Sequence, residues 1–487
     1  MARILFISLY DINAEGLRIM SSILKMENHE PHIIFLKTLR RGPVRYPETD
    51  WIGIGENGRS FQHASGSPIS KKEEDILINT IRNIDPDLIG FSVCSPIVPY
   101  VNYLSKKIRK LFSTPLIWGG PHATMRPGDC VDYCDFVCVG EADSIISQIA
   151  CHLDNGLDLG GITGLTFASE YSATMLQPSP LIQDLDRLPF KDISPTNKYL
   201  IENNSLKTNF SRFSYSGNYH IISSRGCLFR CTYCCEHAFR RLYSPIKFLR
   251  RRSVENVVAE IKHAQELFSF RLVHFEDETF SFNESWLETF RALYKQEIAM
   301  PFICYIYPIR GIEKQIGILK DAGLISTVLS LLSGSERINK TIFRRPYDKE
   351  RFLACARLLH AKKIMYSTDI ITNNPFETEQ DLIDTLNVLR ELPKPFWLDV
   401  NKLYVLKDTE IEKIIDTLNP IEHVSEKLFS LYARLFWLTR FNNYVARLAG
   451  YIRSLSIVRK APFLVNPYLI NLPYIIIDKI FVRRRIS

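Results

Sequence analysis

The stretch that decides the fold is YHIISSRGCLFRCTYCCEHAF, residues 219–239. It opens with a short apolar run typical of a strand and continues into a loop that carries Cys227, Cys231 and Cys234 in a C-x3-C-x2-C array. Three thiolates within eight residues can wrap one corner of a four-iron four-sulfur cluster, whereas full ligation needs four cysteines. The fourth iron is then left open, and an open coordination position is what catalysis at a metal requires.

A zinc knuckle completed by Cys235 or His237 is the alternative for this loop. Structural zinc usually draws its second pair of ligands from a separate segment, and no such segment is apparent in the sequence. We therefore favour the cluster, with Cys235 as a free thiol beside it.

Outward from the cysteine loop, residues 216–410 alternate strand and helix patterns. The clearest helix pattern is residues 253–268, where Ser253 stands at the N-cap and apolar residues fall on one face. Six strand-helix units predict a partial (β/α)6 barrel, a relative of the eight-stranded one, with its active site at the carboxyl ends of the strands. The six strand candidates are residues 219–224, 271–277, 302–307, 326–333, 365–372 and 397–406.

Residues 1–155 show a similar alternation, which predicts a doubly wound, Rossmann-like α/β domain with a parallel sheet and crossover helices. Such a sheet binds ligands beyond the carboxyl ends of its strands. Three predicted strands end in the segments DINAEG (11–16), GGPHAT (119–124) and GEAD (140–143). The strand candidates are residues 3–9, 32–37, 87–93, 115–120 and 135–140, and the helix candidates lie around residues 16–26, 72–83, 99–112 and 142–153.

The remaining segments are a connection and a tail. Residues 156–215 are weakly periodic and rich in turn residues, so we expect a linker that packs on both neighbours. Residues 411–487 are expected to be helical and aromatic, and from Leu428 onward they hold ten Arg or Lys and one acid, although the whole chain carries a net charge of only +8. The basic character therefore belongs to the tail.

Basic amphipathic helices in the tail can cover the barrel or lie on an anionic membrane, and we favour covering the barrel. Pro467, Pro473 and Asp478 make a spanning helix improbable. Nucleic-acid binding is the third choice, because the aromatic residues look buried rather than displayed.

The chain length, the opening segment and the cysteine count indicate the number of domains and the cellular location. A chain of 487 residues suggests two or three domains. The opening apolar run is too short to export or anchor the protein, so a cytoplasmic location is expected. Eleven cysteines without regular spacing favour reduced thiols or metal ligands over a disulfide framework.

With Tyr233 just before the third cysteine and a strand-helix barrel behind it, residues 215–410 resemble the radical S-adenosylmethionine (SAM) enzymes. In that family the open iron chelates the amino and carboxylate groups of SAM. An electron from the cluster then cleaves SAM to methionine and a 5'-deoxyadenosyl radical. The resemblance implies that Cys227, Cys231 and Cys234 are the catalytic cluster ligands, and that flavodoxin or ferredoxin supplies the electron.

Three further segments look like SAM-binding parts of that family. HFEDETFSF (274–282) places Glu276 and Asp277 at an acidic turn near the adenosyl site. LSLLSGSER (329–337) keeps Ser333 and Gly334, with Ser330 and Leu332 as departures from the family pattern.

YSTDIITNNPFET (366–378) keeps Asp369, while Asn373 and Phe376 replace glycines. The resemblance implies that Tyr233, Glu276, Asp277, Ser333, Gly334 and Asp369 bind the cofactor.

The first domain resembles the cobalamin-binding domain that precedes some radical SAM barrels. PDLIGFSVCSP (86–96), IWGGPHATMRP (117–127) and DFVCVGEAD (135–143) look like its corrin-binding segments. Corrin is broad and flat, so small residues let the backbone approach it. The resemblance implies that the ring or its nucleotide tail is bordered by Gly16, Ser92, Val93, Gly119, Gly120, Gly140 and Glu141. For His122, a helix-entry role competes with cofactor contact.

Asn13 stands where one group of cobalamin proteins offers histidine to cobalt. An amide oxygen is a poor cobalt ligand. Cobalamin-dependent radical SAM enzymes commonly bind cobalt with no histidine below it, so we expect Asn13 to border cobalamin whose lower face no protein group ligates.

The resemblance as a whole implies a cobalamin-dependent, class B methyltransferase-like radical SAM enzyme. The family's most frequent reaction methylates an unactivated carbon or phosphorus centre. The 5'-deoxyadenosyl radical removes a hydrogen, methylcobalamin supplies the methyl group and a second SAM restores it. A small-molecule or, if the tail binds membranes, a lipid substrate is expected.

Alternatives are oxidative cyclisation or rearrangement of the tetrapyrrole type, and a cobalamin or cluster sensor without turnover. A tRNA methylthiotransferase would need a second cysteine trio in the first domain, which is not visible.

Overall fold

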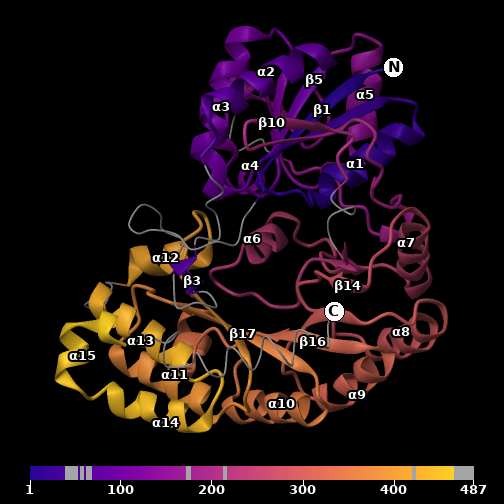
Figure 1. Cartoon of the computed structure of the whole chain (residues 1–487). Coiled ribbons are helices and arrows are strands. Elements are labelled where there is room, and N and C mark those ends of the chain that lie inside the picture. Colours follow the sequence, from indigo (N-terminus) through magenta and orange to yellow (C-terminus); the bar gives the residue numbers. More distant parts are fainter. Residues whose placement is uncertain are drawn as a thin grey trace.

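The computed structural model describes residues 1–38, 68–171, 177–211, 217–418 and 424–465, together with the backbone of the two-residue strands β3 (Gly53–Ile54) and β4 (Ser60–Phe61). Within these ranges the chain forms two bodies, each built on a largely parallel sheet with helices packed against it (Figure 1).

The first body is the expected doubly wound domain. Five parallel strands stand in the order β2-β1-β5-β6-β7, and β1 and β2 are buried along nearly their whole length, as strands covered by helices on both faces should be. The strands are β1 (Arg3–Leu9), β2 (Glu30–Leu36), β5 (Leu88–Ser92), β6 (Leu116–Gly119) and β7 (Phe136–Cys138). Their helices are α1 (Glu15–Met26), α2 (Lys71–Ile84), α3 (Val98–Leu111), α4 (Pro121–Met125) and α5 (Ile146–Asp154). All five strand predictions are confirmed.

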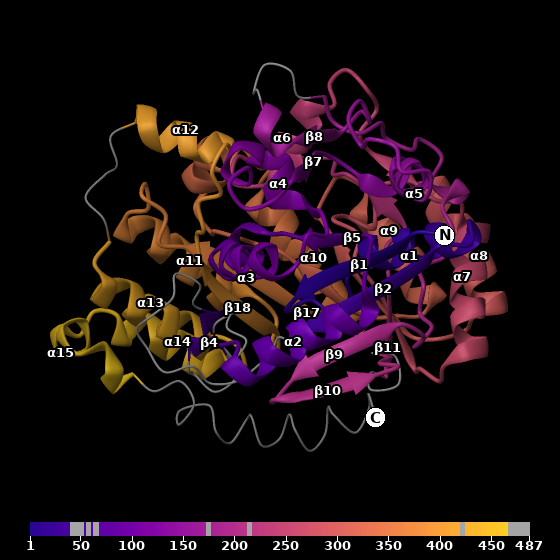
Figure 2. The ribbon, with the colours of Figure 1, turned by 90° about the horizontal axis from the view of Figure 1, so that it is seen from above.

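The segment expected to be a linker supplies both edges of this sheet. β8 (Leu165–Phe167) pairs antiparallel with β7, while β9 (Lys198–Glu202) pairs parallel with β2 and antiparallel with β10 (Ser205–Thr208). From above, β9 and β10 extend the sheet beyond β2 (Figure 2). Asp192 anchors this segment, because its carboxylate accepts hydrogen bonds from Ser21 of α1 at 2.7 Å and from Lys198 of β9 at 2.6 Å.

The second body is the expected partial barrel. Six parallel strands pair in sequence order and do not close on themselves, so the sheet is an open, curled half-barrel. The strands are β11 (Asn218–Ile221), β14 (Leu272–Phe275), β15 (Phe302–Ile306), β16 (Leu324–Leu329), β17 (Met365–Thr372) and β18 (Trp397–Lys402). The helices outside them are α7 (Val254–Leu267), α8 (Glu284–Glu297), α9 (Ile312–Ala322), α10 (Lys349–Ala361) and α11 (Glu379–Glu391).

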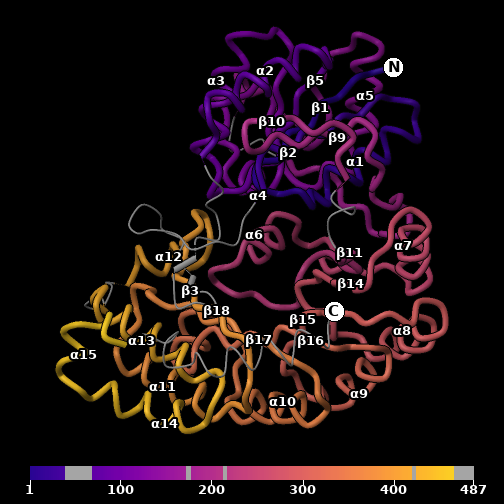
Figure 3. The backbone as a smooth tube through the Cα atoms, in the orientation of Figure 1, coloured from indigo at the N-terminus to yellow at the C-terminus, as the bar shows by residue number. Residues whose placement is uncertain are grey.

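The local sequence explains these elements. Ser253 accepts a hydrogen bond from the backbone N–H of Asn256 and so caps α7, whose valines and Ile261 are buried as their spacing predicts. Between β11 and α7 the chain forms a small antiparallel ribbon, β12 (Ser224–Arg225) with β13 (Arg250–Arg251), and the helix α6 (Cys235–Leu242). The backbone trace shows α6 between the two bodies, below α4 (Figure 3).

The C-terminal helices α13 (Glu426–Leu438), α14 (Asn443–Ile452) and α15 (Ser456–Lys460) extend the outer helical layer of the barrel beside α11, whereas α12 (Glu410–Thr417) lies apart from them (Figure 1). The N–H of Ile411 in α12 donates to the carbonyl of Thr232 in the cysteine loop. The apolar residues of α13 belong to the barrel core, and Arg459 pairs with Glu379 of α11 at 2.6 Å. Ordinary packing therefore describes this part of the tail. In the described ranges no helix is long and apolar enough to cross a membrane. Pro467, Pro473 and Asp478 lie outside the described residues.

Candidate active site between the two sheets

A cavity of about 430 Å³ lies between the carboxyl ends of the first sheet and those of the first barrel strands. Ser92, Gly119 and Gly140 border it from the first body, while Gly226, Glu276 and the helix α6 border it from the second. Doubly wound sheets and barrels both bind ligands at the carboxyl ends of their strands, and here the two binding edges share one space. Of the residues predicted from the sequence, the cavity is bordered by Gly16, Ser92, Gly119, Gly120, Gly140, Glu141 and Glu276.

One arm of the cavity is apolar and enters the first body between its sheet and the helices α1 and α5. Side chains from the sheet and from both helices border this arm: Phe6, Leu17, Met20, Leu88, Ile117 and Ile149. A lining of this character suits a flat, largely apolar group such as the aromatic base of the nucleotide tail of cobalamin, because burying apolar surface there is favourable. The lining therefore fits the expected cofactor.

Asn13 lies in the β1–α1 loop, next to Ala14, which borders the cavity. Its backbone N–H donates to the Asp11 carboxylate at 2.8 Å, and its carbonyl accepts from the buried Arg18 side chain at 2.8 Å. The side-chain oxygen of Asn13 is buried, and no described protein group donates to it. Because buried polar atoms normally have partners, this oxygen fits a hydrogen-bonding ligand such as a corrin amide. The position of Asn13 agrees with a role other than cobalt ligation.

At two of the predicted glycines, Gly120 and Gly140, neighbouring atoms lie too close to the backbone to admit a Cβ. Gly120 has φ +92°, and a Cβ there would lie 2.9 Å from the backbone nitrogen of Val93. Gly140 has φ +98°, and a Cβ there would overlap the hydroxyl of Tyr243, which α6 of the barrel places over it. Gly140 therefore lies where the first body contacts the second.

Val93 and His122 are buried and do not border the cavity. The Val93 N–H donates to the Gly119 carbonyl at 2.8 Å, and its carbonyl accepts from the His122 N–H at 2.9 Å. His122 Nδ1 lies 3.0 Å from the Ser95 hydroxyl, and burial lowers the pKa of this imidazole. Both residues hold the turn that enters α4, which is the helix-entry role considered for His122.

Glu141 links the two bodies. Its carboxylate pairs with Arg225 at 2.7 Å and with the buried Arg250, and Arg225 also pairs with Asp143 at 2.7 Å. Burial raises the pKa of Glu141, but the two guanidinium groups more than offset this and hold it below the usual range. Since Arg225 stands two residues before Cys227, these ion pairs fix the cysteine loop against the first body.

The cysteine loop is held by its own backbone and by the barrel. Gly226 has φ +86°, and a Cβ there would lie 2.7 Å from the Phe248 carbonyl. Thr232 donates its hydroxyl to the Ile342 carbonyl at 2.7 Å. Burial raises the pKa of the Cys227 thiol to about 12 and also raises the pKa of the Cys231 thiol. Metal binding at these cysteines must therefore displace protons.

The donor set of this loop fits a cluster better than a single ion. Four thiolates around one zinc ion lie about 3.8 Å apart, given Zn–S bonds of about 2.3 Å in a tetrahedron. Among the described residues, the one group of three metal-ligating side chains whose ligand atoms lie within 4.8 Å of one another is His220, His274 and Glu276, which contains no cysteine. At least one pair of sulfur atoms among Cys227, Cys231 and Cys234 is therefore more than 4.8 Å apart, which suits the several irons of a cluster.

The three acidic residues of the turn after β14 have different surroundings. Glu276 borders the cavity and contacts His220, while Glu278 borders the cavity and has its pKa raised by burial and then by Asp277. Asp277 is buried and accepts hydrogen bonds from the Ser223 backbone at 3.1 Å and hydroxyl at 2.7 Å. Its observed contacts thus hold the end of β11.

The other residues implied by the SAM resemblance lie away from the cavity. The Gly334 N–H donates to the Thr385 hydroxyl at 2.9 Å, and Ser333 is also buried beside Thr385. Asp369 accepts from the Ser330 hydroxyl at 2.8 Å, and burial raises its pKa to about 6. Tyr233 packs edge-to-face on Phe343 with ring centroids 4.9 Å apart. Their contact with SAM stays a prediction.

Sequence reasoning missed several residues of the site. Arg225, Glu236, Phe239 and Tyr243 all border the cavity, and Arg250 reaches Glu141 from the β13 strand. A signal existed for Arg225, because it immediately precedes the glycine of the cysteine loop. Glu236, Phe239 and Tyr243 belong to α6 and its C-terminal cap, and Arg250 belongs to β13; the place of both elements between the two bodies depends on the tertiary fold.

Comparison with known proteins bears on both bodies. Residues 221–389 match the radical SAM superfamily, and residues 65–150 match the B12 binding domain. An uncharacterised methyltransferase, PH0819, from Pyrococcus horikoshii is 28% identical over 214 residues, which are 42% of each chain. Cytidylyl-2-hydroxyethylphosphonate methyltransferase from Streptomyces wedmorensis is 23% identical over 57% of this chain and 56% of its own.

The anaerobic magnesium-protoporphyrin IX monomethyl ester cyclase of Synechocystis is 23% identical over 62% of this chain and 58% of its own. The chain thus spans about half the length of the curated relatives it matches.

Two solved structures share the arrangement of both bodies. The radical S-adenosylmethionine methyltransferase TsrM from Kitasatospora setae, solved with cobalamin and a [4Fe-4S] cluster, superposes with a TM-score of 0.62 at 16% identity, over 86% of this chain and 76% of its own. The cobalamin-dependent S-adenosylmethionine radical enzyme OxsB, solved with aqua-cobalamin, has a TM-score of 0.57 at 15% identity, over 86% of this chain and 55% of its own. At these identities the likeness establishes the fold.

Proposed function

The chain belongs to the cobalamin-binding radical SAM family, and on that premise we propose that it cleaves SAM reductively and methylates an unactivated carbon of a small-molecule substrate. Its cofactors are a four-iron four-sulfur cluster, SAM and cobalamin. When bound, these groups supply a hydrogen-abstracting radical and a transferable methyl group. Cys227, Cys231 and Cys234 would hold the cluster, and the first-body strand ends with the apolar arm would hold cobalamin.

The observation that carries the proposal is the shared cavity. Gly226 and Glu236 flank the cluster cysteines and border the same space as Gly119 and Gly120. A substrate radical formed next to the cysteine loop would therefore meet the methyl group before other reactants, since proximity within one cavity replaces a diffusive encounter.

The protein's own residues shape this space. Arg225 and Arg250 hold the first body on the cysteine loop through Glu141, so the two cofactor positions keep a fixed relation. Phe239 and Phe248 line the barrel side of the cavity with apolar surface, which reduces the access of water. Such a site suits a reactive intermediate that must be kept from side reactions.

The test is an anaerobic incubation of the fully loaded protein with a reductant and SAM that carries an isotope-labelled methyl group, in the presence of a host extract. We expect release of 5'-deoxyadenosine and labelled methyl in one extract component. A loaded protein that releases no 5'-deoxyadenosine would sink the proposal and favour a cobalamin or cluster sensor.

Oxidative cyclisation is the second candidate, because the Synechocystis cyclase is among the relatives. The same incubation separates the two reactions. Cyclisation predicts 5'-deoxyadenosine without labelled methyl in the product, together with a product that has lost hydrogen.

The electron donor and a lipid substrate are further parts of the proposal. Flavodoxin or ferredoxin would reduce the cluster. Peripheral membrane contact through residues 428–487 predicts that the full chain floats with anionic liposomes and that a chain shortened before Leu428 does not. Equal flotation of both forms would discard membrane contact and the lipid substrate with it.

A further inference from the structure

We propose that His220, His274 and Glu276 form a binding site for a divalent first-row metal ion, outside the cysteine loop and open toward the cavity. One ligand atom from each residue lies within 4.8 Å of the other two, and all three side chains are half-buried. This inference goes beyond methyl transfer and does not depend on it.

Strand geometry brings the three side chains together. His220 of β11 and His274 of β14 are direct partners in the parallel register, and their ring centroids lie 5.0 Å apart. Glu276 follows His274 by two residues, so both point to the same face of the sheet. The Glu276 carboxylate contacts His220 Nδ1.

The donor set is one that metals use. Two imidazoles and one carboxylate on one face bind iron(II) with open coordination positions, and a similar His2Glu set binds catalytic zinc. Glu276 also borders the cavity, so an open position on the metal would face the substrate space. Tyr305 stacks on His274 with ring planes 8° apart and centroids 5.9 Å apart, which restrains the orientation of that imidazole.

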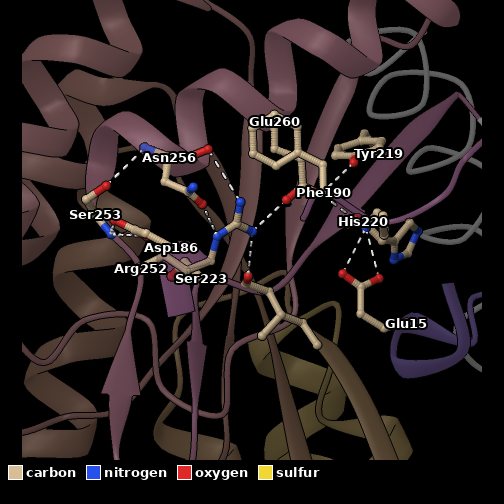
Figure 4. Close-up of polar contacts among 12 residues, drawn as sticks. Glu15, Asp186, Phe190, Tyr219, His220, Ser223, Arg252, Ser253, Asn256 and Glu260 are labelled. Atoms are coloured by element: carbon tan, nitrogen blue, oxygen red, sulfur yellow. Dashed lines mark hydrogen bonds and ion pairs between the residues drawn. The ribbon is translucent and has the colours of Figure 1, made fainter. Parts of the chain in front are cut away.

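The surrounding charges leave room for a dication. Glu15 of α1 lies near His220 (Figure 4). Lys191 pairs with Glu15 at 2.9 Å and also donates to the His220 carbonyl. Arg252 pairs with Glu260 at 2.6 Å. Both cations therefore lie against other acceptors, whereas the ion pair recorded for Glu276 in the described part of the chain is with His220. A metal ion bound to His220 Nδ1 and to the Glu276 carboxylate would replace the hydrogen bond between them.

Zinc retention tests the site. The chain loaded with its cluster and cobalamin is dialysed anaerobically against micromolar Zn²⁺, freed of excess metal and analysed for zinc, iron and cobalt. We expect stoichiometric zinc in the unaltered chain, and roughly a tenfold or greater loss of zinc in His274→Gln and Glu276→Gln with unchanged iron and cobalt.

The matched control is His263→Gln, because His263 is 47% exposed and lies 3.8 Å from Glu266, and the described residues supply no third metal ligand to this pair. It should retain zinc like the unaltered chain. The proposal is overturned if the unaltered chain holds no zinc, or if all three variants hold it equally. His220 and Glu276 would then be an ordinary hydrogen-bonded pair.

X-ray absorption at the zinc edge of the unaltered chain gives an answer that does not depend on how the variants fold. We expect imidazole scattering and nitrogen or oxygen ligands at about 2.0–2.1 Å. Sulfur ligands at about 2.3 Å would place zinc on the cysteine loop and overturn the proposal.

Discussion

At Gly140 the backbone of one body meets a side chain of the other. Its φ of +98° disfavours any residue with a Cβ, and that Cβ would also lie 2.6 Å from the Ser179 hydroxyl. Strain and overpacking should together make Gly140→Ala less stable by roughly 2 kcal/mol or more. Thermal unfolding of the cofactor-free chain measures this loss. Gly317→Ala in α9 is the control, because a Cβ there meets nothing within 4 Å, and its unfolding temperature should stay level or rise.

Alanine substitutions at two adjacent cysteines should show that Cys234 is a cluster ligand and that Cys235 is not. Cys234→Ala removes one of three expected ligands, so iron and sulfide per chain should fall and release of 5'-deoxyadenosine should stop. Cys235→Ala removes an adjacent thiol in the same loop and should keep both the cluster and the release. Loss of the cluster in both variants, or in Cys235→Ala alone, would contradict the assignment of Cys234 as the third ligand.

Among secondary-structure elements, the long periodic ones could be predicted from the sequence and the short edge strands could not. The sequence predicts a strand at residues 365–372, and β17 has the same bounds. Its eight residues alternate between a half-buried and a buried face, as expected of a strand. β8 and β9 have only three and five residues, and their pairing depends on the distant strands β7 and β2. The local sequence pattern carries little information about which distant strand a short strand pairs with.

The stability of strand β9, which lies between β2 and β10, should depend on Asp192. Burial raises the pKa of this carboxyl, but the charge of Lys198 more than offsets burial and holds the folded-state pKa well below 3.8. Asp192→Asn leaves the fully buried Lys198 ammonium without its anionic partner, so the free energy of unfolding at neutral pH should fall by roughly 3–5 kcal/mol. Hydrogen exchange in β9 should rise with it.

The difference in unfolding free energy between the unaltered chain and Asp192→Asn should depend on pH, because the pKa of Asp192 is lowered in the folded state. Because the folded-state pKa of Asp192 is depressed, its stabilisation is present above pH 3.8 and is lost as the pH falls through the folded-state value. The gap between the unaltered chain and Asp192→Asn should therefore narrow in acid. Asp321→Asn is the control, since Asp321 pairs with Arg291 and Lys295 at the surface and should change stability little. Comparable losses in both variants at neutral pH would contradict the prediction.

Across the whole molecule, the chemistry of each body could be predicted from the sequence, but the way the bodies meet could not. The cysteine spacing and the glycine-bearing strand ends are local patterns. The contact between Gly140 and Tyr243 joins residues about a hundred positions apart in the sequence, so no local sequence pattern predicts it. The same holds for Glu141, which was expected beside the corrin and also clamps the barrel through Arg250.

This clamp should control how firmly cobalamin is held. Two of the described ion pairs that cross between the bodies differ in setting: Glu141 pairs with the buried Arg250, whereas Arg126 pairs at 2.9 Å with Asp408, which is 54% exposed. Glu141→Gln leaves a buried guanidinium with a weaker partner, so the first body should loosen. Cobalamin retained after gel filtration should fall about tenfold, which corresponds to about 1.4 kcal/mol, while iron per chain stays constant. Asp408→Asn should retain cobalamin like the unaltered chain, because exposed pairs contribute little. If both variants lose cobalamin to the same extent, or neither does, burial of the Glu141 clamp is not what holds the two bodies around the cofactor.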